Sequence, residues 1–557
     1  MPPRPYLPLP WPGLILLAGL FLLTGLVGPA PWKGEDAINL GVAWEFTQGA
    51  PWYAPRLADA AFNEAPLYHW VAALLATLLA PLTAFHNGVR LSNFLWLAAA
   101  LLALTALARR TRDKEAEQVT PYLLLGGIGL VVHGHEAQPQ LAVLATQALG
   151  LWSATLLIDK PWRGLLPGGL ALGLAYLAGG TLAAAPVAAM LLAAPCFPPP
   201  RPHVPAWLAE TLPAPKSPSR LPAVAALIGA LALAAALAAL WLVPLAEQAP
   251  ARFAAWLTAD RATLSDGGIG KNLADLLALL AWFAWVPLPL AGWSLWRRRH
   301  SLATPAVALP LILLLANLIA RSLTATQAQD ALVFYVPLTA LAALEATRLR
   351  KGAAAAYSWF AVITFTLAGA YVWLGWTAMV AGWPEPLVRT LHRLTPGFEG
   401  RIELLPLLLA LAVTALWGWL LYRASQVRTT AERSLFRGPT HWLAGLTLVW
   451  VLVIALWLPW LEYGRSYDGT IAAMRQAMPD GAAPACVSVR LAPAQKALVR
   501  YTTGWQLKSE SRGRESCGWL MIQTAPGEER VQPGWERVWE GHRPGDRSER
   551  LRLFKRR

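Results

Sequence analysis

Charged residues are scarce in this chain. Asp, Glu, Lys and Arg make up 14% of the 557 residues, whereas hydrophobic residues make up 56%, and the mean hydropathy is +0.42. A soluble protein of this length needs a far more highly charged surface. The composition therefore excludes a soluble enzyme and predicts an integral membrane protein in contact with membrane lipids.

Cysteine is also rare, with only Cys196, Cys486 and Cys517 in the whole sequence. Three cysteines are too few for a disulfide scaffold, and their spacing matches no zinc site. Cys486 and Cys517 lie close to the C-terminus, where an oxidising compartment would allow a disulfide between them. A disulfide and two unpaired buried thiols are both open alternatives at this point.

Long apolar runs recur along the first 461 residues, and a membrane-spanning helix needs about 20 such residues. The runs predict about thirteen transmembrane helices. We place them at residues 12–29, 90–108, 119–134, 141–158, 164–180, 182–197, 221–245, 274–296, 303–321, 331–347, 355–380, 402–423 and 441–461. The count is least certain around Gly179 and Thr324, where two predicted helices adjoin.

Basic residues gather in every second loop between these helices. They include Arg109, Arg110, Arg112 and Lys114, then Lys160 and Arg163, then Arg201, Lys216 and Arg220, then Arg297, Arg298 and Arg299, then Arg348, Arg350 and Lys351, and finally Arg423, Arg428, Arg433 and Arg437. Short basic loops face the cytoplasm. The N-terminus is therefore predicted inside and the C-terminus outside. The net charge of +15 is then mostly topological, and it predicts no nucleic-acid partner.

Three predicted outer segments are long enough to carry function: residues 30–89, residues 246–273 and the tail 462–557. The first contains apolar stretches too interrupted to span, which are typical of helices lying in the membrane interface. The tail contains the alternating stretches "CVSVRL" and "GWLMIQT", which indicate strands. We therefore predict an all-α transmembrane domain (1–461) followed by a small extracytoplasmic α/β domain (462–557).

The most informative stretch follows the first predicted span. Glu35 and Asp36 stand side by side there, and Glu64 lies further along in "FNEAPLYHW". Carboxylates at a membrane surface are costly unless they are solvated or used. The simpler alternative is that the pair caps a helix beginning at Ala37, because acidic residues favour helix N-termini.

These motifs resemble the membrane glycosyltransferases of the GT-C fold, in particular protein mannosyltransferases and the bacterial lipid A aminoarabinose transferases. The matching pieces, in order, are "GEDAINLGVAWE" (34–45), "NEAPLYHW" (63–70) and "VRLSN" (89–93), with weaker matches in "HGHEAQ" (133–138), "GLALGLAYLAGG" (169–180) and "FYVPLTALAALEA" (334–346). The resemblance covers nearly the whole chain. It implies a multi-pass protein of the bacterial inner membrane with a periplasmic active site.

The resemblance also implies a reaction. A sugar passes with inversion from a polyprenyl-phosphate donor to a lipid, glycan or protein acceptor, and Asp36, or its neighbour Glu35, is the catalytic base. The aminoarabinose transferases carry Glu-Lys-Pro-Pro-Leu where this chain has Asn63, Glu64, Ala65, Pro66 and Leu67. Glu64 thus replaces a phosphate-facing lysine. It could bind a divalent cation such as Mg²⁺ or Mn²⁺, or contact the sugar directly.

Other candidate substrate-binding residues flank this stretch. Arg252 and Arg261 can bind a phosphate bidentately, the alternative being a solvated helix face. His135 and Glu136, next to His133, are predicted to contact sugar or phosphate, with a metal site or a polar cap as alternatives. Tyr68 of the "PLYHW" run is also assigned to the substrate.

Gln327, Gln329 and Asp330 cluster before the tenth predicted span, where an ordinary turn is the simpler interpretation.

Two alternative functions for the whole chain agree less well with the sequence. A lipid or polysaccharide transporter should carry charges in mid-span and repeated halves, and neither is visible. A non-catalytic export component would leave the polar first outer segment unexplained.

Overall fold

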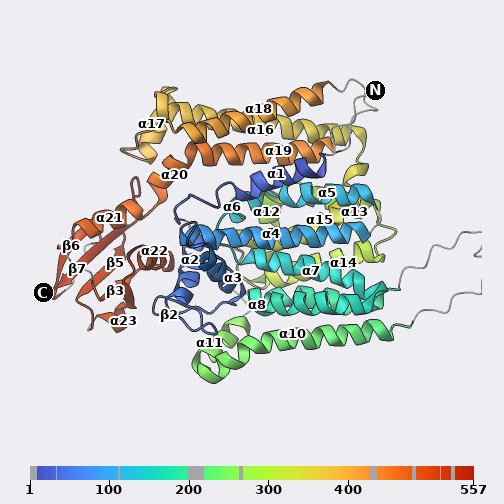
Figure 1. Cartoon of the computed structure of the whole chain (residues 1–557), viewed down its shortest axis with the longest axis horizontal. Helices are drawn as coiled ribbons and strands as arrows, with labels where there is room; N and C mark the ends of the chain where they lie inside the picture. Colours follow the sequence, from blue (N-terminus) through green and yellow to red (C-terminus); the bar gives the residue numbers. More distant parts are fainter. Residues whose placement is uncertain are drawn as a thin grey trace, which may run out of the picture.

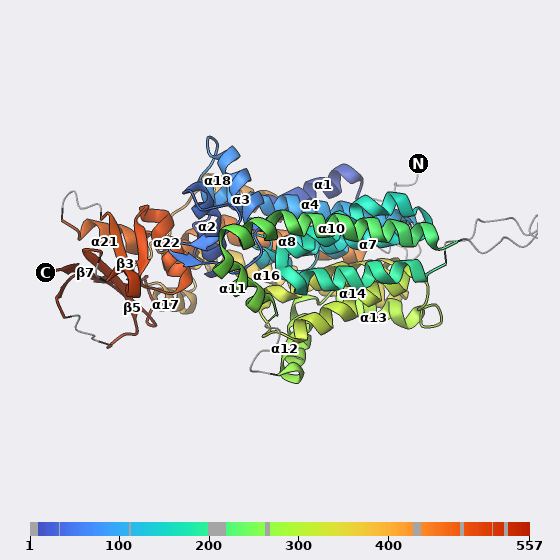
Figure 2. The same ribbon diagram turned by 90° about the horizontal axis from the view of Figure 1, so that it is seen from below.

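The structure is a computed structural model that describes residues 9–32, 34–110, 113–198, 219–261, 268–426, 436–479, 484–514, 516–528 and 533–557. A long helical bundle carries a small sheet domain at one end (Figures 1 and 2). We call this the domain end of the bundle. Of the residues used above for orientation, Arg112, Arg201, Lys216, Arg428 and Arg433 lie outside the described residues, as do residues 262–267 of the second predicted outer segment.

Eight helices of the described residues are long and apolar enough to cross a membrane, or nine if one bent pair forms a single span. They are α4 (Phe85–Arg110), α7 (Gln140–Asp159), α8 with the short helix η1 (Pro161–Cys196), α10 (Leu221–Gln248), α14 (Pro305–Ser322), α16 (Lys351–Ala381), α18 (Leu404–Ser425) and the continuous α19–η4–α20 (Arg437–Arg465). The polytopic helical class is confirmed. Each of the thirteen predicted ranges overlaps a helix, but several of these are too short or too broken to count as spans.

Helix α8 joins two of the predicted helices, 164–180 and 182–197. Its backbone leaves the helical region at Gly179 and Gly180, and Gly180 has a positive φ of 63° that only glycine adopts easily. A Cβ built on Gly168 would lie 3.7 Å from Leu191 Cδ2, although a straight helix would separate these residues by roughly 35 Å. The chain therefore reverses at Gly179–Gly180, and both predicted helices are present as an antiparallel pair.

Other predicted spans are interrupted. The range 274–296 consists of α12 (Ile269–Phe283) and α13 (Pro287–Arg297), which meet at an angle of 102°. The range 119–134 is split into α5 (Lys114–Leu125) and α6 (Ile128–His133). The ranges 12–29 and 331–347 form only the short α1 (Trp11–Leu23) and the pair η2 (Ala328–Phe334) and α15 (Tyr335–Ala343). Apolar composition alone does not reveal these breaks, because glycine and proline interrupt the helices without changing hydropathy.

The first predicted outer segment covers the domain end of the bundle. It forms α2 (Gly34–Thr47), the two-residue strands β1 (Arg56–Leu57) and β2 (Ala60–Ala61), and α3 (Leu67–Leu79). Helix α11 (Pro250–Arg261) of the second predicted outer segment lies at the same end, as does α17 (Glu385–Leu394) between two spans (Figure 1).

The C-terminal domain is a five-stranded mixed sheet in the order β4-β3-β5-β7-β6, and the two stretches predicted as strands form β3 and β5. Strand β3 (Cys486–Arg490) pairs in parallel with β4 (Gln506–Ser509) and β5 (Trp519–Thr524), whereas β7 (Arg550–Arg556) pairs antiparallel with β5 and β6 (Trp535–Gly541). Helix α22 (Pro493–Thr503) provides the crossover that parallel strands require. Helix α21 (Asp468–Gln476) joins the sheet to α20.

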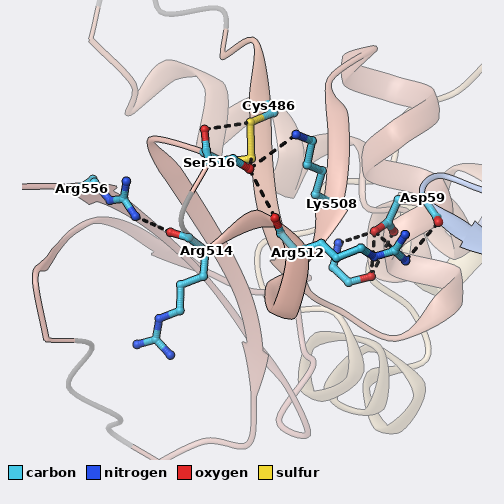
Figure 3. Close-up of a disulfide and its surroundings, with 9 residues drawn as sticks. Asp59, Cys486, Lys508, Arg512, Arg514, Ser516 and Arg556 are labelled. Atoms are coloured by element: carbon cyan, nitrogen blue, oxygen red, sulfur yellow. Dashed lines mark hydrogen bonds and ion pairs between the residues drawn. A yellow bond between two sulfur atoms is a disulfide. The ribbon is translucent and has the colours of Figure 1, made fainter.

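Two sets of contacts hold this domain against the bundle. Arg500 Nε of α22 donates to Glu45 Oε1 of α2 at 2.7 Å. Asp59 accepts from the backbone N–H of Ser509 at 2.7 Å, and Arg512 forms an ion pair with it at 3.1 Å (Figure 3). Within the domain, Cys486 and Cys517 form a disulfide, which decides between the two alternatives above. The first outer segment and the domain thus form one continuous structure.

Candidate active site

A polar cavity of about 290 Å³ opens at the domain end of the bundle. Its wall comes from the N-termini of α2 and α3, the loop before α7, the chain reversal in α8, the end of α11 and the residues before η2. The polar lining residues are Glu35, Asn39, Asn63, Glu64, Gln138, Gln140, Asp260, Gln327 and Gln329. None of the described lining residues is Arg, Lys or His. The cavity is therefore rich in carboxylates and amides.

Glu35 and Glu64 both face this cavity. Burial raises the pKa of Glu35, the charge of Glu136 raises it further, and His133 lowers it. Glu64 is accessible from the cavity, but protein surrounds it on most sides, and this desolvation together with the charge of Glu35 raises the pKa of Glu64 to about 7. Both carboxyl groups therefore hold a proton at higher pH than an ordinary Glu side chain does.

Buried hydrogen bonds fix the amides of the cavity wall. Asn39 Nδ2 donates to the carbonyl of Ala137 at 2.9 Å, and its Oδ1 lies 2.9 Å from His69 Nε2. Burial lowers the pKa of His69 to about 3, so the ring is neutral and Nε2 must carry its proton to donate to Asn39. On the opposite wall, Arg321 donates to Gln140 Oε1 at 2.9 Å and pairs with Asp330 at 3.0 Å. These contacts orient the wall before any ligand arrives.

Helix α11 closes one side of the cavity. Asp260 accepts from the backbone N–H of Thr181 at 2.9 Å and from its hydroxyl at 2.6 Å, and so caps the second half of α8 just after the reversal. Trp256 is buried against Trp241, with ring centroids 5.0 Å apart. Arg252 of the same helix donates to the carbonyls of Ala54, at 3.0 Å, and of Pro55.

Asp36 faces away from the polar cavity. Its side chain is only 2% exposed, and Arg90 binds it through Nε at 3.1 Å and through Nη2 at 2.5 Å. The backbone N–H of Ala137 also donates to Asp36 at 2.7 Å. Arg90 in turn donates to the carbonyls of Pro29 and Ala30. The buried ion pair between Asp36 and Arg90, together with these backbone hydrogen bonds, therefore links α2, α4 and two loops.

A second, mostly apolar cavity of about 110 Å³ lies on the Asp36 side, against the segment after α1 and against α19, η4 and α20. Asp36, Arg90, His135 and Glu136 contribute its polar surface. His135 hydrogen-bonds through both ring nitrogens to backbone carbonyls, those of Val131 and Phe21. Glu136 lies 2.5 Å from His133 Nδ1. The structure thus places His135 and Glu136 beside Asp36 in this second cavity, while the charge of Glu136 still reaches Glu35 and raises its pKa.

The remaining predicted residues lie elsewhere. Tyr68 is fully buried, where its hydroxyl donates to Asn93 at 2.8 Å and accepts from the N–H of Gln138 at 3.0 Å. Arg252 holds the first outer segment, and Arg261 is exposed at the last position of α11. None of the three lines the polar cavity. Among the described residues, no group of three His, Cys, Asp or Glu side chains is placed to hold a metal ion, so the divalent cation at Glu64 finds no ligand set there.

Sequence reasoning missed several residues of the wall, namely Asn39, Asn63, Gln138, Gln140 and Asp260, and it also missed Arg321, which holds Gln140 from behind the wall. Arg321 carried a usable signal. It follows an apolar run at the end predicted to face outward, where orientation does not call for a basic residue. The amides gave no such signal, because single Asn and Gln residues are common in any loop.

No family model and no curated protein matches the chain. The solved structures that share its fold include two of the same protein. They are ArnT from Cupriavidus metallidurans bound to undecaprenyl phosphate (12% identity, TM-score 0.67, covering 97% of this chain and 96% of that one) and the same protein in the apo state (14% identity, TM-score 0.63, 97% of each chain). ArnT is a lipid A aminoarabinose transferase of the GT-C fold. The predicted fold is confirmed over nearly the whole length, and at this identity the likeness shows the fold alone.

Proposed function

We propose that this protein is a membrane glycosyltransferase that takes its sugar from a polyprenyl-phosphate donor. The observation that carries the proposal is Glu35, an accessible carboxylate with a raised pKa, in a polar cavity at the domain end of an ArnT-type fold. Carboxylates and amides are the groups that hydrogen-bond sugar hydroxyls. The bound undecaprenyl phosphate of the first ArnT structure supports a lipid-phosphate donor.

In the proposed reaction, Glu35 removes the proton of the acceptor hydroxyl. The acceptor oxygen attacks the anomeric carbon, the bond between that carbon and the phosphate oxygen breaks, and the polyprenyl phosphate leaves with the bonding electrons. Attack opposite to the leaving group inverts the anomeric centre. A raised pKa makes Glu35 a stronger base than an ordinary carboxylate. Asp36 is then a positioning residue, because it holds α2 against α4 through Arg90.

The leaving phosphate needs a hydrogen-bond donor, and none of the described lining residues is basic. Glu64 fits this role in its protonated form, because its pKa of about 7 keeps much of it neutral near pH 7. Glu64 is assigned here as the group that donates to the phosphate of the donor. A Mg²⁺ or Mn²⁺ ion is the alternative source of positive charge, and no step is routed through it.

We further propose that the domain end faces the periplasm and that the chain resides in a bacterial inner membrane. The basic residues Arg109, Arg110, Arg297 and Arg423 end their helices at the opposite end of the bundle, which supports a cytoplasmic location for that end. The acceptor is then a lipid, glycan or protein outside the cytoplasm.

The test begins with cells that lack the protein. Lipid-linked sugars extracted from them should contain an accumulated polyprenyl-phosphate sugar, and purified wild-type protein in liposomes should discharge it in the presence of cell-envelope acceptors. Glu35→Gln should leave this pool intact. Glu536→Gln, the same exchange at an exposed position on β6 of the sheet domain, serves as a control for folding.

Two outcomes would contradict the proposal. If no lipid-linked sugar accumulates and the purified protein transfers none, the fold serves another purpose. If the purified protein moves the lipid across the bilayer without cleaving it, the transporter alternative is correct.

A further inference from the structure

A cavity of about 590 Å³ lies where the C-terminal domain meets the bundle, and it shares no lining residue with the polar cavity. Its wall contains the apolar side chains of Leu394, Trp460 and Leu461. It also contains three arginines, Arg465, Arg543 and Arg547, and a single carboxylate, Asp546. Nothing in the proposed transfer reaction uses these residues.

The cavity lies at the ends of membrane-spanning helices. Leu394 belongs to the connection between α16 and α18, and Trp460 and Arg465 belong to the last turns of the span Arg437–Arg465. The indole of Trp460 donates to Thr395 Oγ1 at 2.7 Å, which ties the two span ends together. The cavity is therefore level with the membrane surface, where tryptophan is enriched.

The sheet domain closes the cavity with the loop 543–548. Gly545 has a φ of +75°, and a Cβ on it would lie 2.0 Å from the carbonyl oxygen of Leu394. Only glycine allows the loop to approach the bundle this closely. The arginines on either side of Gly545 are thereby brought to the surface of the bundle.

The three arginines differ in how their charge is compensated. Arg543 pairs with Asp546 and with Glu549, the latter at 3.4 Å, and stacks over Tyr467 at 4.5 Å. Arg465 and Arg547 are exposed, and their guanidinium groups form no ion pair with any residue that the structure describes. Two unbalanced positive charges thus stand beside an apolar wall at the level of the membrane surface.

Helix α17 extends this surface. Leu387 and Leu391 lie one turn apart on it, while Arg389 and Arg393 lie one turn apart on another face. Such a helix lies flat in the interface and attracts anionic lipids. Its last residue, Leu394, lines the cavity.

We propose that this cavity binds the headgroup of an anionic phospholipid, with Arg465 and Arg547 on the phosphate and Leu394, Trp460 and Leu461 against the glycerol and acyl region. The occupant is a lipid rather than a free phosphate, because three of the seven named wall residues are apolar and lie at or beside the ends of membrane-spanning segments. The bound lipid holds the sheet domain at the membrane surface.

The full-length protein, purified in detergent, is titrated with phosphatidylglycerol or phosphatidylcholine, and bound lipid is counted by native mass spectrometry. Each basic residue near an anionic lipid surface contributes about fivefold in affinity. The double variant Arg465→Gln/Arg547→Gln should therefore bind phosphatidylglycerol roughly 25-fold more weakly than wild type. Arg475→Gln, an exposed arginine of α21 outside the cavity wall, is the matched control and should bind normally.

Preference of the wild type for phosphatidylglycerol, lost only in the double variant, would support the site. Equal binding of the two lipids by the wild type, or normal binding by the double variant, would overturn it. Displacement of the lipid by excess inorganic phosphate would assign the arginines to a free phosphate instead. The two substituted side chains are exposed, and an unchanged thermal midpoint of each single variant verifies that folding is preserved.

Discussion

Glu35 and Asp36 are consecutive residues of α2, yet they lie on two different sides of the structure. Glu35 faces a polar cavity that Glu64 and Asp260 also line, whereas Asp36 is buried beside Arg90 and lines a mostly apolar cavity. Consecutive residues of a helix point about 100° apart, so one helix can supply both a reactive and a structural carboxylate. In the proposed mechanism Glu35 is the base and Asp36 positions α2 through Arg90, so the two neighbouring carboxylates have different roles.

The largest effect is expected for Glu35→Gln. Loss of a general base lowers the rate by about 10² to 10⁴. The thermal midpoint should stay near the wild-type value, because Glu35 is accessible and its charge is not needed for packing. Transfer is measured with the accumulated donor in liposomes. Normal transfer by Glu35→Gln would move the base to another residue.

Asp36→Asn should act on stability instead. The substitution leaves Arg90 buried with an uncompensated charge, and breaking one partner of a buried ion pair costs about 3 to 5 kcal/mol. We expect a large fall in the thermal midpoint, with the remaining folded protein still transferring sugar. A folded Asp36→Asn protein with no activity would exchange the roles of the two neighbours.

Glu64→Gln tests how the carboxyl group of Glu64 makes the stability of the protein depend on pH. The pKa of Glu64 is about 7 in the folded protein against an ordinary value of 4.5, so the folded state holds this proton more tightly than the unfolded state. The resulting stability is present below pH 4.5 and is lost as the pH rises through about 7. The wild-type thermal midpoint should therefore fall between these pH values more than that of Glu64→Gln.

The same substitution makes a kinetic prediction. If neutral Glu64 donates to the donor phosphate, wild-type transfer declines above pH 7, and Glu64→Gln, whose amide always donates, loses this decline. Parallel pH profiles of the two proteins would remove Glu64 from the phosphate. Dependence on added Mg²⁺ or Mn²⁺ that disappears in the variant would favour the metal alternative.

The smallest effect is expected for Arg261→Ala. Its exposed position predicts a stability change within about 0.5 kcal/mol. If its guanidinium reaches the lipid phosphate, the apparent KM for the donor should rise about fivefold with kcat unchanged, which corresponds to roughly 1 kcal/mol for an exposed ionic contact. An unchanged KM would place the phosphate elsewhere.

Much of the fold could be predicted from hydropathy and the order of short motifs. The apolar ranges located the helices, and the alternating stretches located β3 and β5. The number of spans could not be predicted, because breaks at Gly126–Gly127 and between α12 and α13 depend on tertiary packing. Tyr335 illustrates this, since its ring occupies the space that a Cβ of Gly127 would need.

The sequence predicted several residues of the candidate site, but it did not predict how their side chains are arranged. Sequence reasoning selected Glu35, Asp36 and Glu64, and the resemblance assigned the base to Asp36 or its neighbour Glu35. The ion pair between Asp36 and Arg90 could not be predicted, because the two residues lie 54 positions apart and no local pattern links them. Arg252 and Tyr68 looked like ligand contacts for a similar reason. Their hydrogen-bond partners are backbone groups and a distant amide, which leave no mark on the sequence.

The contact between Glu45 and Arg500 has a consequence for synthesis. The two residues lie 455 positions apart, so the ribosome completes α2, which carries Glu45, long before it reaches Arg500 on α22. Glu45 is only 1% exposed in the finished protein, where it pairs with both Arg56 and Arg500, and Arg56 is the only one of these two partners present before α22 is made. A nascent or truncated chain that stops before α22 therefore leaves the first outer segment without the cover that the sheet domain gives it.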